Sequence, residues 1–127
     1  MEWPLPAEAD VLYRHFTEPD LLQSWYWPPA LGTQVSLDVH PGGTWRISSE
    51  AAGIAVSGSY SLVRPGEQLD FSWQWRGEEA MTSVSLRFSD GRLGLEHSGF
   101  ADPESVALHR QGWNDCVGRL AGLLERG

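Results

Sequence analysis

The sequence predicts an α+β domain in which an antiparallel sheet packs against one long C-terminal helix. Apolar and polar residues alternate through the middle of the chain, as they do in strands with one buried face. Turns that contain glycine separate these runs at short intervals, so consecutive strands are expected to pair as hairpins. After residue 102 the apolar positions recur every three or four residues, which is the period of a helix.

Two short helices are expected before the sheet. Apolar side chains fall at helical spacing in residues 7–16, and Pro6 suits the first turn of that helix. Thr17 or Asp20 is able to cap a second helical turn. Two prolines at 28–29 then end it, because proline lacks the backbone donor and fixes φ.

Five or six strands are expected in the central part of the chain. Each run alternates with a period of two, and the turns between them include Pro-Gly-Gly at 41–43 and Asp-Gly at 90–91. Glycine supplies the positive φ values that tight reversals require. The expected strands cover residues 35–39, 44–48, 54–63, 69–75, 82–88 and 93–97.

The final helix is expected to begin at Asp102-Pro103. It is long enough, at roughly 30 Å, to cross a small sheet. It is also the only expected element that can cover the buried face of that sheet. Its apolar stripe contains Val106, Trp113, Cys116, Val117, Leu120, Leu123 and Leu124.

Length, charge and cysteine content restrict the class of protein. The 127 residues suit one domain, 1–127, and the net charge of −8 argues against nucleic acid or an anionic membrane as a partner. The one cysteine, Cys116, cannot form an internal disulfide, which fits a reducing compartment. No segment has the ~20 apolar residues of a membrane span and no signal peptide is evident, so a cytoplasmic location is expected.

Four segments, taken together and in order, resemble a known family. They are residues 17–25, 38–46 (Asp-Val-His-Pro-Gly-Gly-Thr-Trp-Arg), 58–69 and Gly112-Trp113. Their succession is similar to the activator of heat-shock-protein-90 ATPase-like family, within the START-like (SRPBCC) helix-grip superfamily that includes polyketide cyclases. The resemblance covers essentially the whole chain. It implies a curved antiparallel sheet that wraps around the C-terminal helix, with a cavity between them.

One segment departs from that family pattern. Family members usually begin with a full strand, whereas only residues 1–5 precede the first expected helix here. The first strand is therefore expected to be truncated or missing. An exposed sheet edge would follow, and with it the possibility of a homodimer.

No catalytic, cofactor or metal motif is present in the sequence. The Pro-Gly-Gly turn at 41–43 lacks the lysine and the helix of a phosphate-binding loop. Cysteine and histidine do not occur at metal-ligand spacing, and Cys116 lies on an apolar helix stripe, where an inert thiol is expected. We therefore assign no catalytic residue, no metal and no cofactor.

Two of the four histidines are candidates for the cavity. His97 shares a strand face with apolar residues, and His109 precedes Trp113 by one turn on the same helix face. These two are either an acid–base or ligand-polarising pair, or two independent histidines that are half-exposed or have their hydrogen bonds satisfied. His15 and His40 are expected at the surface.

Two charged residues lie inside expected strands. Arg46 follows Trp45, so alternation allows only one of them to face the cavity, and the expected arrangement has Trp45 inward and Arg46 in solvent. Glu96 is expected to point outward if His97 points inward. An inward arginine would require a carboxylate from the protein or from a ligand.

The aromatic content is the strongest functional signal. Seven tryptophans occur in 127 residues, beside four phenylalanines and three tyrosines. Such rings either fill a core or line a pocket for a flat, apolar molecule. The candidate lining residues are Trp25, Trp27, Trp45, Phe71, Trp73, Trp75, His97, Phe100, His109 and Trp113.

Three functions are compatible with these features. The first is binding of a hydrophobic or aromatic small molecule in a cavity between the sheet and the C-terminal helix, without catalysis. The second is a polyketide-cyclase-like or hydrolase-like enzyme that uses the same cavity. The third, implied by the resemblance, is a chaperone cofactor that acts through protein interaction.

Overall fold

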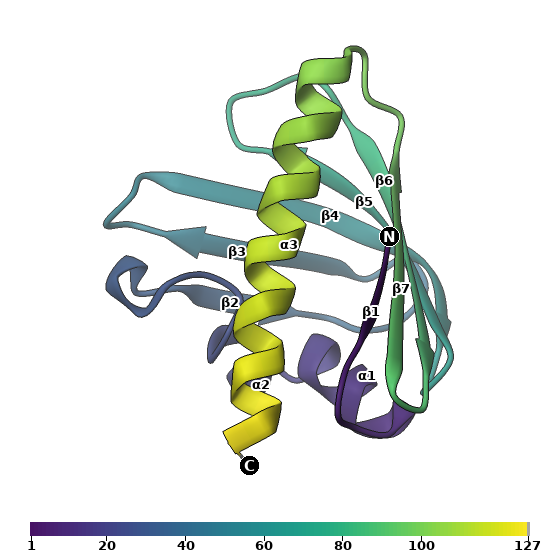
Figure 1. The fold of residues 1–127 in the computed structure, drawn as a ribbon. Helices are drawn as coiled ribbons and strands as arrows, with labels where there is room; N and C mark the ends of the chain where they lie inside the picture. Colours follow the sequence, from purple (N-terminus) through teal and green to yellow (C-terminus); the bar gives the residue numbers. More distant parts are fainter. Residues whose placement is uncertain (127) are drawn as a thin grey trace.

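A seven-stranded antiparallel sheet curves around one long helix in the computed structural model, which describes residues 1–126 (Figure 1). The strand order is β1-β7-β6-β5-β4-β3-β2, so every strand from β2 to β7 pairs with its neighbour in sequence. Consecutive pairing follows from the short turns. The strands are β1 Glu2–Pro4, β2 Gln34–Leu37, β3 Thr44–Ser49, β4 Ile54–Arg64, β5 Gln68–Trp75, β6 Thr82–Ser89 and β7 Arg92–Ser98.

The two short helices form, but their ends differ from the expected ones. Helix α1 spans Ala9–Thr17, so Pro6 lies ahead of its first turn instead of within it. The first helical N–H, of Ala9, donates 2.9 Å to Oδ1 of Asp90 in the β6–β7 turn. Only the tertiary structure brings this carboxylate to the positive end of the helix.

Helix α2 spans Pro19–Gln23 and has no side-chain cap, which corrects the expectation of capping by Thr17 or Asp20. Glu18 occupies the N-cap position, and Pro19 begins the helix. The Thr17 hydroxyl instead donates 2.9 Å to the carbonyl of Tyr13 in α1. A short 3-10 turn, η1 (Pro29–Leu31), follows and ends at Gly32, whose φ is 58°.

The first strand is truncated but present. β1 pairs with β7, with Trp3 opposite Leu93. It therefore covers part of the sheet edge that was expected to be exposed. The indole N–H of Trp3 also donates 3.0 Å to Oδ1 of Asn114 on the long helix. β1 therefore joins the sheet to the helix in spite of its three residues.

The long helix α3 spans Pro103–Arg126 and lies across the concave face of the sheet (Figure 1). Alternation along the strands directs apolar side chains toward α3 and polar ones to the outer face, as in β6 with its buried Val84, Leu86 and Phe88. The buried residues of α3 are Trp113, Cys116, Val117 and Leu120. This arrangement confirms the predicted helix-grip fold.

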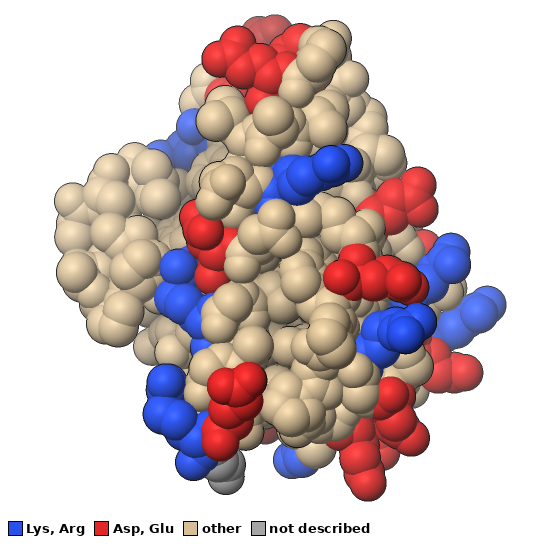
Figure 2. Space-filling model, in the orientation of Figure 1, with Lys and Arg blue, Asp and Glu red and all other residues tan. Residues whose placement is uncertain are grey.

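No helix within residues 1–126 combines the length and the apolar character needed to cross a bilayer. Acidic side chains gather at the N-terminal end of α3, whereas both signs mix near its C-terminal end (Figure 2).

Candidate ligand-binding site

A pocket of about 190 Å³ lies between the end of β5, residues 108–116 of α3 and the segment that follows α2. Leu108 is at its mouth with 65% of its surface exposed. The walls are mostly aromatic. The lining residues are Tyr26, Trp27, Trp73, Trp75, Leu108, His109, Gly112, Trp113 and Cys116.

The periodicity of two elements explains most of this lining. Trp73 and Trp75 are two positions apart in β5 and so share its inner face. His109, Trp113 and Cys116 follow at spacings of four and three on α3, which places them on one helix face. The pocket forms where these two faces meet.

Aromatic rings contact one another around the pocket. Trp73 and Trp113 have ring centroids 5.2 Å apart, which joins the sheet wall to the helix wall. Trp27 is nearly parallel to Trp75, with an interplanar angle of 10° and centroids 6.4 Å apart. Both geometries lie within the range of favourable aromatic pairs.

Two tryptophans of the wall donate hydrogen bonds to the two candidate histidines. Trp75 Nε1 donates 3.0 Å to Nε2 of His109, and Trp113 Nε1 donates 3.0 Å to Nδ1 of His97. Because an indole nitrogen only donates, these two imidazole nitrogens must be acceptors.

The remaining imidazole nitrogens also have partners, which assigns both tautomers. His109 Nδ1–H donates 2.8 Å to the carbonyl of Ser105. His97 Nε2–H donates 2.7 Å to Oγ1 of Thr82, whose hydroxyl donates 3.3 Å to the carbonyl of Trp73. All four ring nitrogens are therefore used within the protein, in the neutral form of each ring.

Burial and, as the smaller cause, the neighbouring His109, whose ring centroid is 5.1 Å away, together lower the pKa of His97 to about 3. The hydrogen bonds act in the same direction, since protonation of Nδ1 would place two donors against each other. The two histidines do approach each other, as the prediction of an acid–base or ligand-polarising pair requires. Their hydrogen bonds, however, fit the positioning of two indoles better than proton transfer.

This geometry predicts a loss of stability in acid. His97 has a pKa near 6.5 when unfolded and about 3 when folded, so the unfolded state binds more protons between these values. The free energy of unfolding should therefore fall as the pH drops from about 6.5 toward 3. We expect His97→Gln to show a smaller decrease in melting temperature between pH 7 and pH 5 than the wild type.

His40→Gln is the control for this measurement. His40 is exposed, and its pKa is raised by the Pro41 carbonyl and then by Asp38. The contribution of His40 to the free energy of unfolding is present below pH 6.5 and is lost as the pH rises. His40→Gln should therefore not reduce the loss of stability in acid. An equal decrease in wild type and His97→Gln would contradict the assignment of His97.

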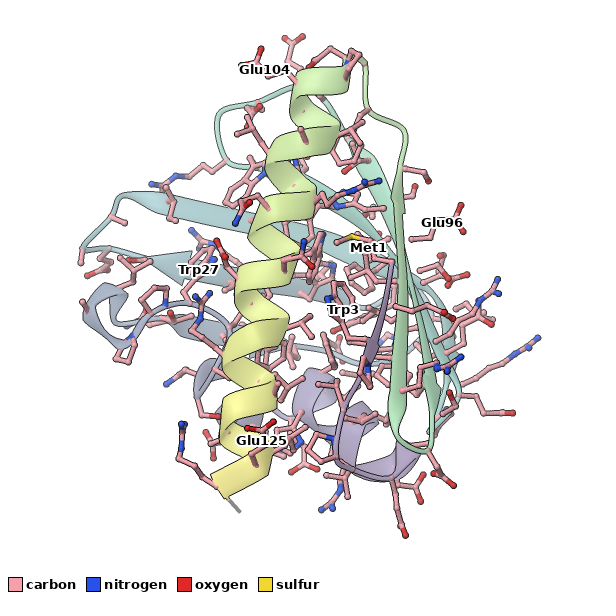
Figure 3. The ribbon with its side chains drawn as sticks, in the orientation of Figure 1. Met1, Trp3, Trp27, Glu96, Glu104 and Glu125 are labelled. Atoms are coloured by element: carbon pink, nitrogen blue, oxygen red, sulfur yellow. The ribbon has the colours of Figure 1, made fainter. Side chains whose placement is uncertain are left out.

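The structure places five of the ten candidate lining residues on the pocket: Trp27, Trp73, Trp75, His109 and Trp113. His97 and Phe100 line a separate hollow of about 170 Å³, which shares His109 and Trp113 with the pocket. Figure 3 shows Trp27, at the pocket, and Met1, at the hollow, on opposite sides of α3.

Trp25, Trp45 and Phe71 do not line the pocket. Trp25 is 2% exposed, packs edge-on against Phe16 and donates 3.2 Å to the carbonyl of His15. Trp45 and Phe71 face inward as alternation predicted, but they pack against each other with centroids 5.4 Å apart. They share the correct face of the sheet but fill a region beyond the pocket.

Four lining residues were not among the candidates: Tyr26, Leu108, Gly112 and Cys116. The helical spacing of Gly112 and Cys116 from His109 was a usable signal for two of them. Tyr26 carried no such signal, because it lies in an irregular segment. Burial raises the pKa of the Cys116 thiol to about 11, in agreement with the expected inert cysteine.

The charged strand residues lie as expected. Arg46 is exposed and Trp45 buried, and Glu96 points away from the sheet into solvent (Figure 3). His40 is exposed, whereas His15 is half-buried with Nδ1 2.8 Å from the carbonyl of Val11. Within residues 1–126 no three His, Cys, Asp or Glu side chains are grouped to hold a metal ion.

Solved structures of several other proteins have the same fold. DynU16, a protein of the dynemicin biosynthetic locus, has a TM-score of 0.84 at 24% identity, covering 98% of this chain and 46% of its own. MLL2253 from Mesorhizobium loti has a TM-score of 0.83 at 20% identity, covering 99% of this chain and 95% of its own. PFC0360w, an HSP90 activator from Plasmodium falciparum, has a TM-score of 0.81 at 16% identity, covering 98% and 94%.

These identities are low enough that the likeness shows the fold alone, and this chain spans less than half the length of DynU16. Among curated proteins, none matches the sequence. The family described as Activator of Hsp90 ATPase homolog 1-like protein matches residues 6–125. The chain therefore belongs to the Activator of Hsp90 ATPase homolog 1-like protein family.

Proposed function

We propose that this protein binds a flat, apolar small molecule in the pocket between β5 and α3 and does not transform it. The observation that carries the proposal is the wall of aromatic rings around the 190 Å³ space. Aromatic walls hold flat molecules through dispersion and stacking. Pockets of this kind, mostly apolar with few polar groups, are typical of small-molecule sites.

The pocket offers little support for acid–base chemistry. His109 has both ring nitrogens engaged by protein atoms, and His97 is likewise engaged. The Cys116 thiol is protonated at neutral pH, because burial raises its pKa to about 11. A cyclase-like or hydrolase-like reaction would have to proceed without a free base from these groups.

The size of the pocket restricts the ligand. Its volume is below the roughly 300–1,000 Å³ of sites for drug-sized molecules. One or two fused rings fit inside, and a larger ligand would extend past Leu108 into solvent. 2-Acetylnaphthalene is therefore a suitable probe, since it is flat, neutral and of this size.

Gly112 provides a direct test. It lines the pocket, and a Cβ added there would meet no atom within 4 Å, so we expect a leucine at this position to take up part of the pocket space. We expect 2-acetylnaphthalene to quench the tryptophan fluorescence of the wild type and to raise its melting temperature. Gly112→Leu should bind the probe at least tenfold more weakly.

Gly118→Leu is the matched control. Gly118 is also an α3 glycine with open space around its Cβ position, but it lies outside the pocket. Both substitutions remove a helical glycine, which should stabilise α3 similarly. Absence of binding to the wild type, or equal binding by the two variants, would refute the proposed pocket function.

A second candidate function rests on the likeness to an HSP90 activator of similar length, since PFC0360w is covered over 94% of its chain. This chain would then stimulate the ATPase activity of an Hsp90 partner by protein interaction. An ATPase assay with purified Hsp90 tests it. Stimulation that Gly112→Leu leaves unchanged would support this candidate independently of the pocket.

A further inference from the structure

Arg119 bridges two residues of the pocket wall. Its Nη2 donates 2.7 Å to the carbonyl of Tyr26 and lies 3.5 Å from Sγ of Cys116. Its Nε donates 3.1 Å to the carbonyl of Trp25. The half-buried guanidinium is therefore held in place next to the part of the wall that Tyr26 and Cys116 form, although Arg119 itself does not line the pocket.

The charge of Arg119 has no counter-ion among residues 1–126. No carboxylate lies within 4 Å of it, and its protein partners are two neutral carbonyls and a thiol. The thiol and the Tyr26 phenol remain protonated, because burial raises the pKa of each. The two N–H groups of Nη1 have no partner within the described part of the chain.

We propose that Arg119 is the specificity-determining residue of the pocket and that the ligand is a flat apolar molecule carrying a carboxylate. This inference rests on the proposed binding function. The aromatic walls hold the ring system, and the guanidinium attracts a carboxylate that extends past Tyr26 and Cys116 toward it. Hydrogen bonds between charged partners are about twice as strong as neutral ones, and they gain further where water is partly excluded.

Two features of the chain disfavour the binding of an anion, and neither outweighs the attraction by Arg119. The net charge of −8 acts over long distances, where salt screens it, whereas the guanidinium acts at short range. Asp115, one turn before Arg119, is exposed and accepts a hydrogen bond from Gln111. Asp115 makes no ion pair with Arg119 within 4 Å, so it does not occupy the guanidinium.

The test compares two probes of similar shape, 2-naphthoate and 2-acetylnaphthalene, by fluorescence titration at pH 7. We expect the wild type to bind 2-naphthoate about five- to tenfold more tightly. Arg119→Gln should lower the affinity for 2-naphthoate about tenfold and change the affinity for 2-acetylnaphthalene less than twofold. Arg119→Lys, which keeps the charge but not the fork of donors, should fall between them.

Arg110→Gln is the matched control, because it removes the same charge from an exposed position on α3 beside the separate hollow. It should leave both affinities unchanged, and higher salt should weaken only 2-naphthoate in the wild type. The melting temperature of each variant establishes that it is folded. If Arg119→Lys and Arg119→Gln bind both probes equally weakly, Arg119 only fixes the 25–26 backbone and the proposal is wrong.

Other outcomes separate the two proposals. If the wild type binds both probes with equal affinity, the carboxylate preference is wrong and the pocket function stands. If Arg110→Gln alone weakens 2-naphthoate, the anion binds at the hollow, and the role of Arg119 is refuted. If neither probe binds the wild type, the pocket function itself fails.

Discussion

Gly58→Ala should lower the free energy of unfolding by about 3 kcal/mol, at the upper end of the range for overpacked sites. A Cβ at this position in β4 would overlap the carbonyl oxygen of Ser72 in β5 and come within 2.8 Å of Nε1 of Trp45. Backbone cannot move aside as a flexible side chain does. Thermal unfolding should show a decrease of roughly 12 °C in melting temperature.

The same chemical change on the helix should have the opposite sign. Gly118 has no atom within 4 Å of its Cβ position, so Gly118→Ala should raise the free energy of unfolding by about 0.5–1 kcal/mol. An unchanged melting temperature in Gly58→Ala would mean that β4 and β5 separate easily at this point, and the steric argument would be wrong.

Trp113→Ala should lower the free energy of unfolding by about 3–5 kcal/mol, the range for removal of a large buried aromatic side chain. Trp113 is 4% exposed, packs against Trp73 and satisfies Nδ1 of His97 with its indole N–H. Its loss creates a cavity and also leaves a partly buried acceptor without its donor. Chemical denaturation monitored by circular dichroism measures the change.

Trp3→Ala is the matched control for this prediction. Trp3 also donates a hydrogen bond, to Asn114, but it is half-buried and its partner is exposed to water. The substitution should therefore destabilise the protein by clearly less than Trp113→Ala. Equal effects of the two substitutions would show that the indole–imidazole pair at the pocket has no special energetic role.

The positions of most elements could be predicted, because each depends on residues close together in the chain. Alternation in β5 and β6 and the Asp-Gly turn at 90–91 give the strands and their connection within one or two residues. Helix ends were less accurate, since α1 is capped by Asp90 from a turn more than 80 residues later. No local pattern contains such a contact.

About half of the candidate lining residues could be placed on the pocket for a similar reason. Trp73 and Trp75 follow from strand alternation, and His109 and Trp113 from helical spacing. The facing direction of Trp45 and Phe71 was also correct. Strand alternation predicts which way a side chain faces. It does not predict where along the curved sheet the rings pack against one another and where they border an open pocket.

By itself, the sequence determined that this chain forms an antiparallel sheet around a long helix, with aromatic side chains between them, because hydrophobic periodicity is a local property. The tertiary structure alone decided which of those rings border open space, that Trp75 and Trp113 donate to His109 and His97, and that Arg119 reaches the carbonyls of residues 25–26. These contacts join residues 16 to 94 positions apart, so they depend on how the sheet curves around α3 and not on any pattern along the chain.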